Sequence, residues 1–136
     1  MPANSPLTLF QVTGRAMSAQ LVRMNAAASN LANAGTVTAT EAEAYRPLRT
    51  VFGQQLDQAN GLSTVQVNGV IRSDATPIRQ HDPGHPLADE NGDVWAAPVD
   101  ENAEMVEMLE SSRQYQNVVE AMQTAKQLML ETMRMK

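Results

Sequence analysis

The sequence predicts a mainly α protein with a small β insert, an α+β fold. Long N- and C-terminal helices are expected to pack as an antiparallel, coiled-coil-like pair. Apolar residues recur at alternating steps of four and three along residues 7–34, and again along residues 105–133. That spacing places one apolar seam along a long helix. Between the two seams lie β-branched runs bounded by turn residues, which indicate strands.

The N-terminal helix is predicted within residues 1–36. Ser5 suits an N-cap and Pro6 a first helical turn. Asn33 and Gly35 predict its end, because both residue types tolerate left-handed backbone. At 1.5 Å per residue, a helix over residues 7–34 would be about 42 Å long. Its seam consists of Phe10, Gly14, Met17, Leu21, Met24, Ala28 and Leu31.

The middle of the chain, residues 37–97, is predicted to be a β-rich or irregular insert. Residues 36–44 resemble a loop, and residues 45–52 and 65–71 are expected to be strands. Pro47 places the first of them at an edge or a strand start. Turn residues at 82–84 and 91–93 precede a short strand at 94–96.

The C-terminal helix is predicted within residues 98–136. Asp100 is a good N-cap, and Glu101 and Glu104 lie in the first turn, where the helix dipole favours acids. Ser112 and Lys126 interrupt the apolar seam, and polar residues at such positions can fix the register of packed helices. The seam consists of Met105, Met108, Ser112, Tyr115, Val119, Met122, Lys126, Met129 and Met133.

Composition predicts a thin core. The chain has 136 residues, with one Trp, two Tyr and two Phe, but nine Met and many Ala. Methionine adapts to irregular surfaces. We expect the isolated chain to be marginally stable, with partner chains supplying the missing burial. The absence of cysteine excludes disulfides and thiol chemistry.

Charge is unevenly distributed. The net charge of −5 argues against a general nucleic-acid binder. Residues 1–40 hold two arginines and no acid, whereas residues 89–110 hold acids and no Lys or Arg. The default interpretation is a solvated helix face, because exposed charge pairs contribute little. The alternative is that the basic end of one copy complements the acidic segment of another.

Signals for other functional classes are weak. The apolar runs are too short for direct membrane insertion, and no Sec-type signal peptide is visible. His81 and His85 have the four-residue spacing of a zinc motif, but Pro83 and Gly84 between them indicate a turn. We therefore interpret them as ordinary loop histidines. The sequence predicts no catalytic residue, no metal site and no cofactor.

Three segments carry a family resemblance. Residues 18–36, which contain Asn30-Leu31-Ala32-Asn33, resemble the N-terminal signature of bacterial flagellar basal-body rod proteins. Residues 83–94 resemble the segment before the last helix in short subunits of the proximal rod. So does Pro98-Val99-Asp100, followed by Glu104-Met105-Val106 and residues 112–116.

The resemblance implies a structural subunit and no enzyme. Such a subunit would leave the cell unfolded through the flagellar type III export apparatus, without a cleaved signal peptide. It would polymerise helically with itself and other rod proteins into the periplasm-spanning, torque-transmitting shaft of the basal body. The terminal helices would form the inner tube, and the insert would face outward.

Assembly and helix packing are assigned to the apolar seams and two asparagines. Asn30 and Asn33 lie near a helix end, where their amides can satisfy backbone groups. The complete set comprises Phe10, Met17, Leu21, Met24, Ala28, Asn30, Leu31, Asn33, Met105, Met108, Tyr115, Val119, Met122 and Met129.

Two alternatives remain open from the sequence. One is a small helical adaptor that docks a partner peptide between its two helices, for which a methionine-rich stripe would be suitable. It predicts a stable, ordered monomer with an open groove. The other is an enzyme with a metal centre at His81 and His85, which predicts bound metal in the purified protein.

Overall fold

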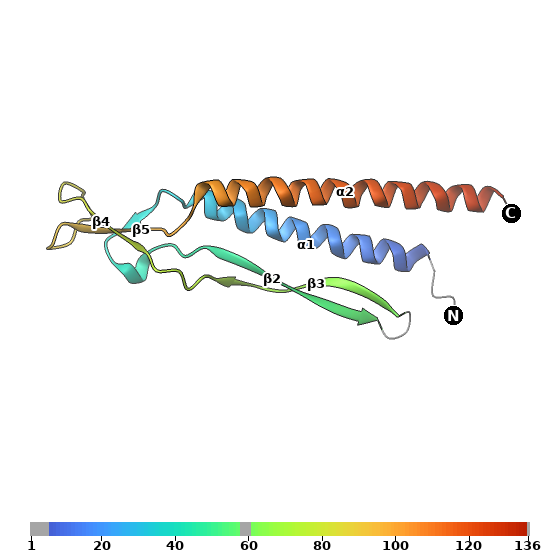
Figure 1. Cartoon of the computed structure of the whole chain (residues 1–136), viewed down its shortest axis with the longest axis horizontal. Helices are drawn as coiled ribbons and strands as arrows, with labels where there is room; N and C mark the ends of the chain where they lie inside the picture. The colour runs from blue at the N-terminus through green and yellow to red at the C-terminus, as the bar shows by residue number, and fades with distance from the viewer. Residues whose placement is uncertain (1–5, 58–60, 136) are drawn as a thin grey trace.

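A computed structural model describes residues 6–57 and 61–135. Helix α1 spans Pro6–Ala32, and helix α2 spans Glu101–Arg134. The two helices lie side by side and antiparallel, with the start of α1 and the end of α2 at the same end of an elongated molecule (Figure 1). The mainly helical α+β class with a β insert is confirmed; the coiled-coil geometry of the pair stays a prediction.

A long β-hairpin follows α1 along its other side. Strand β2 spans Leu48–Asp57 and pairs antiparallel with β3, Leu62–Arg72, with one irregularity between Val51 and Phe52. Figure 1 shows the hairpin beside α1, so that α1 lies between α2 and the hairpin. The predicted strands at 45–52 and 65–71 are therefore confirmed in kind, but both extend further toward the hairpin turn.

A second, smaller sheet forms the end of the molecule that lies away from the start of α1 and the end of α2 (Figure 1). Its strand order is β1 (Val37–Thr38), β5 (Asp93–Ala96) and β4 (Ile78–His81), all antiparallel. The predicted strand at 94–96 corresponds to β5. Strand β1 and the short 3₁₀ helix η1, Glu41–Glu43, lie in the stretch expected to be loop. The sequence prediction also missed β4.

Local signals explain where the elements begin and end. Pro47 directly precedes β2, which fits its predicted place at a strand start. The side chain of Asp100 caps α2 by accepting hydrogen bonds from the backbone N–H groups of Asn102 and Ala103. Gly92 has φ 77°, a left-handed conformation that glycine adopts without steric cost, in the predicted turn before β5.

The prediction that left-handed backbone at Asn33 or Gly35 ends α1 is wrong. Among the described residues only Gly61 and Gly92 have positive φ, so neither Asn33 nor Gly35 is left-handed. Instead, the Asn33 side-chain amide donates to the Ser29 carbonyl at 2.8 Å, and Thr36 N–H donates to the Asn33 carbonyl at 3.1 Å. These bonds satisfy carbonyls of the last turn without a glycine cap.

The interior contains small side chains. The buried hydrophobic residues of the described chain are Ala19, Ala26, Ala27, Ala44, Val94, Ala96 and Ala97. Alanine lets helix axes approach closely, but it removes little apolar area from water. The thin core expected from the composition is therefore present.

Candidate assembly surface

The α2 seam is displaced by one residue from the predicted seam at three of its positions. Met108, Tyr115, Met122 and Met129 are half-buried as expected. At three of the intervening positions, however, the less exposed residue is one place earlier than predicted: Glu104, Ser111 and Ala125. At the fourth, Val118 and Val119 are both half-buried.

Two residues of the proposed assembly set lie outside the packed interior. Leu21 is 42% exposed and Met105 is 54% exposed, so neither is buried against the partner helix as predicted. Seam residues Lys126 and Met133 are also exposed. Next to Met105, polar Glu104 occupies the interior, which a count of apolar side chains does not detect. The half-buried members are Phe10, Met17, Met24, Ala28, Leu31, Asn33, Met108, Tyr115, Val119, Met122 and Met129.

Asn30 connects α1 to the start of the hairpin through side-chain hydrogen bonds. Its side chain is fully buried, and its Oδ1 accepts hydrogen bonds from the Leu48 backbone N–H and the Tyr45 hydroxyl, both at 2.8 Å. Its Nδ2 donates to the Leu48 carbonyl at 3.1 Å. One amide thus satisfies both backbone groups of Leu48 at the start of β2. The sequence singled out Asn30, but only the fold identifies these partners.

Arg23 joins three elements at the middle of α1. Its guanidinium lies 2.7 Å from the Glu107 carboxylate of α2 and 6.0 Å from the centre of the Phe52 ring of β2. Arg23 is 16% exposed, whereas Glu107 is 41% exposed, so solvent screens much of the charge attraction. We therefore expect this ion pair to contribute little to the free energy of unfolding.

A second ion pair connects the hairpin to α2. The Arg49 guanidinium lies 2.6 Å from Oε1 of Glu104, whose side chain is 3% exposed. Glu104 Oε2 is buried and has no hydrogen-bond partner among the described atoms. Nearer the hairpin turn, Arg15 donates to the side chains of Gln55 and Thr64. Sequence reasoning missed these arginine contacts, because side chains 40 or more positions apart meet only in the fold.

Large apolar side chains are exposed along the whole molecule. A soluble monomer rarely exposes so much apolar surface without a binding role. They lie on α1, both hairpin strands, β4 and α2, and include Leu9, Leu21, Phe52, Leu56, Ile71, Ile78, Met105, Val106, Leu109, Leu128 and Met133. This extended surface, not a single pocket, is the candidate functional site.

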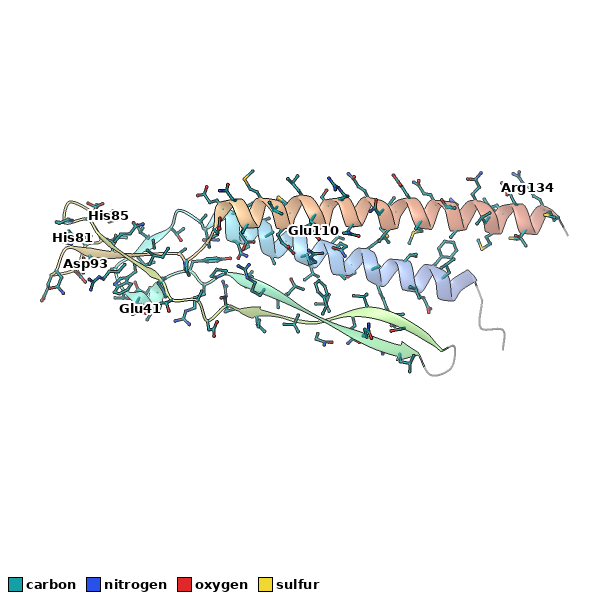
Figure 2. The ribbon with its side chains drawn as sticks, viewed as in Figure 1. Glu41, His81, His85, Asp93, Glu110 and Arg134 are labelled. Carbon is teal, nitrogen blue, oxygen red and sulfur yellow. The ribbon has the colours of Figure 1, made fainter. Side chains whose placement is uncertain are left out.

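The histidines at the sheet end form hydrogen bonds within the chain. His81 Nδ1 lies 3.0 Å from Asp93 Oδ1 across the β4–β5 pair, and His85 Nδ1 accepts from the Leu87 backbone N–H (Figure 2). No group of three or more His, Cys, Asp or Glu with metal-site geometry occurs within the described ranges. The prediction that both are loop histidines is wrong for His81, which is the last residue of strand β4, whereas His85 lies in the bend that follows.

No helix among residues 6–57 and 61–135 is long and apolar enough to cross a membrane.

Two long terminal helices, an alanine-rich interior and an extended apolar surface define an elongated structural protein. Comparison with known families gives the particular class. The family described as "Flagella basal body rod protein" matches residues 10–40. The family described as "Flagellar basal body rod FlgEFG protein C-terminal" matches residues 91–135. The matched segments cover most of α1 and all of α2.

Full-length relatives agree with these families. The chain is 44% identical over 129 residues to the flagellar basal-body rod protein FlgC of Salmonella typhimurium, covering 93% of this chain and 95% of the relative. It is 40% identical to FlgC of Yersinia enterocolitica, covering 95% and 96%. It is 32% identical to FlgC of Agrobacterium fabrum, covering 90% and 88%.

The chain therefore belongs to the flagellar basal-body rod protein family. The resemblance to a proximal-rod subunit is confirmed, and the chain is a structural component of the rod in the bacterial basal body. Its relatives are structural rod proteins, and family membership supports its assembly with other flagellar rod components.

Proposed function

We propose that the chain polymerises helically through α1 and α2 into the torque-transmitting shaft of the proximal rod. One observation carries the proposal: the chain fills its own interior mainly with alanine and leaves many of its large apolar side chains exposed. Neighbouring subunits are the natural source of the missing burial. Contacts that join different surfaces and do not close generate a helical polymer.

The division of labour within the chain is part of the proposal. The terminal segments 1–36 and 98–136 form the rod core domain, with α1 and α2 in coiled-coil-like packing around the inner tube. The insert, residues 37–97, faces outward. The antiparallel contact of α1 with α2 supports this division, as does the position of the small sheet at one end (Figure 1).

We further propose that the chain travels through the type III export apparatus without a cleaved signal and has no enzymatic activity. It acts in the periplasm-spanning rod, with no nucleic-acid partner and no direct membrane insertion. A cysteine-free chain with a small hydrophobic core suits export in the unfolded state, because few packing contacts have to be broken before export.

Leu21→Asp tests the assembly surface. Leu21 is exposed in the isolated fold, so the charge should leave folding intact and block only contacts between subunits. Expression in a bacterium lacking its own copy should give soluble protein, no swimming and no incorporation into isolated basal bodies. Gln11→Asp, at another exposed position of α1, is the matched control and should retain motility.

Normal motility of the Leu21→Asp variant would contradict the proposal. The adaptor hypothesis gives a different pattern, because an adaptor would retain activity outside the rod and would bind a peptide as a monomer in dilute solution.

A further inference from the structure

The long hairpin has two open edges. Strands β2 and β3 pair only with each other, in a two-stranded sheet of their own. Both strands contact α1, so the helix lies against a face of the hairpin, and no strand lies beside the outer edge of either one. An open edge presents backbone N–H and C=O groups at every second residue, and a further strand is what satisfies them.

The Asn30 contact identifies the residues that direct their backbone groups to the open edge of β2. The N–H and C=O of Leu48 bond to the Asn30 side chain and therefore point away from β3. This direction alternates along a strand. The irregularity in the hairpin leaves its extra residue, Asn68, on β3, so the alternation along β2 continues without interruption. Gln54 and Leu56 thus direct their backbone groups outward.

The opposite edge follows from the register of the hairpin. Gln54 pairs with Val65 and Leu56 with Ser63, and residues that pair directly in an antiparallel sheet have the same backbone direction. Val65 and Ser63 therefore direct their groups to the outer edge of β3. Within residues 6–57 and 61–135, no element outside the hairpin hydrogen-bonds to the backbone of these four residues. Leu56 is 61% exposed and Val65 is 44% exposed.

The two edges lack the features that commonly prevent pairing with another chain. Proteins protect open edges with charged side chains, proline or bulges. Residues 50–56 of β2 and 63–71 of β3 contain no charged residue and no proline. Identical strands can therefore approach one another without repulsion between like charges. The one irregularity lies between Val51 and Phe52, so the segments beyond it, 53–56 and 63–67, are the ones open to pairing.

The thickness of the molecule selects a second copy of the chain as the neighbour. Figure 1 is viewed down the shortest axis, and α2, α1 and the hairpin lie one above another in that view. A helix with its side chains is about 10 Å wide, and two strands occupy about 9.6 Å. Copies stacked along the short axis at about 10 Å can therefore pair their strand edges and pack their helices at the same spacing.

We infer that β2 of one copy pairs with β3 of a second copy in the same orientation, so that neighbouring hairpins form a continuous antiparallel sheet. The inference rests on the proposed polymerisation and names one of its contacts. The two edges differ, so each copy offers both, and the contact propagates without closing. Because outward residues pair with outward residues, Gln54 lies opposite Ser63, Val65 or Val67 of the next copy.

Mixed single-cysteine chains test the contact in assembled basal bodies, because the natural chain has no cysteine. A bacterium lacking its own copy expresses a Gln54→Cys chain together with a Ser63→Cys, Val65→Cys or Val67→Cys chain. Each chain holds one cysteine, so a link within one chain is impossible. Mild oxidation of the isolated basal bodies should link Gln54→Cys to one of the three partners, as identified by mass spectrometry of the linked peptides.

Gln66→Cys is the matched control for the partner chain. Its side chain lies on the other face of β3, so it should give at least about tenfold less linked product. A product no greater than that of the control would overturn the inference. Linked dimers of the Gln54→Cys chain expressed alone would show β2 against β2 in a closed pair and would overturn it as well. Neither result affects the proposed rod function, which is measured separately by motility and incorporation into basal bodies.

A proline variant separates backbone pairing from apolar contact. Leu56→Pro, added to the Gln54→Cys chain, removes an outward N–H, which the hairpin itself does not use. It should lower the linked product about fivefold, the effect of one lost hydrogen bond. Leu56→Ala removes the same side chain but keeps the N–H, and should link as well as the parent chain. Equal linking by the proline and alanine chains would overturn the inference, because the strands would then touch without backbone hydrogen bonds.

Discussion

The two ends of the helix pair are built differently. Near the small sheet, α1 and α2 enclose buried polar side chains, namely Asn30, Glu104 and Ser111, and contact the start of the hairpin through Asn30 and Arg49. At the other end, α2 extends beyond α1 and exposes Leu128 and Met133. The chain therefore completes one end with its own contacts and leaves apolar surface uncovered at the other. The same helices serve a folding role and an assembly role at different positions.

Asn30→Ala should give the largest loss of stability. It removes three hydrogen bonds and leaves both backbone groups of Leu48 without their side-chain partner in a buried site. We expect the free energy of unfolding to fall by about 3 kcal/mol, measured by urea denaturation of the purified chain. Asn25→Ala, at an exposed position of α1, is the control and should be nearly neutral.

A decrease in the free energy of unfolding of less than about 1 kcal/mol for Asn30→Ala would contradict the assignment of Asn30 as the residue that holds the hairpin on α1. Its contribution would then be no larger than that of a single ordinary hydrogen bond.

The displaced seam predicts an asymmetry between adjacent serines. Ser111 is fully buried, with its hydroxyl bonded to the Glu107 and Met108 carbonyls, whereas Ser112 is half-buried. Ser111→Leu should therefore overpack the helix pair and lower the unfolding free energy by about 2 kcal/mol. Ser112→Leu should cost less than about 0.5 kcal/mol. A larger loss for Ser112→Leu than for Ser111→Leu would support the seam predicted from the sequence alone, and equal losses would contradict the asymmetry.

Local signals in the sequence predicted both helices and the start of α2, whereas the N-cap assigned to Ser5 lies outside the described residues. The alternating apolar steps indicated both helices, and Asp100 and Pro47 indicated where α2 and β2 begin. These features depend on residues close together in the chain. The antiparallel order of the terminal helices followed from the same seams and the long insert between them.

The failures have a common physical cause. The predicted seam gave Met105 preference over Glu104, because an apolar side chain is the better guess for an interior position. The fold reverses this with Arg49, which pairs with the Glu104 carboxylate from 55 positions away. Strands β1 and β4 were missed for the same reason, since each is short and is defined only by pairing with the distant β5. The polar side chains of Gln54 and Gln55 do not fit an apolar strand pattern, so the second half of β2 was also missed.

The free end of α2 should respond least to mutation in the isolated chain. Met133 is 65% exposed, whereas Met108 is half-buried between the helices. Met108→Ser should lower the unfolding free energy by about 2 kcal/mol, because apolar area is lost from the packed interface. Met133→Ser should change it by less than about 0.3 kcal/mol in the same urea titration, yet reduce incorporation into basal bodies. A similar loss of stability in both variants would mean that the C-terminal end of α2, around Met133, is already packed within one chain. Its apolar side chains would then have no surface left to offer a neighbouring subunit.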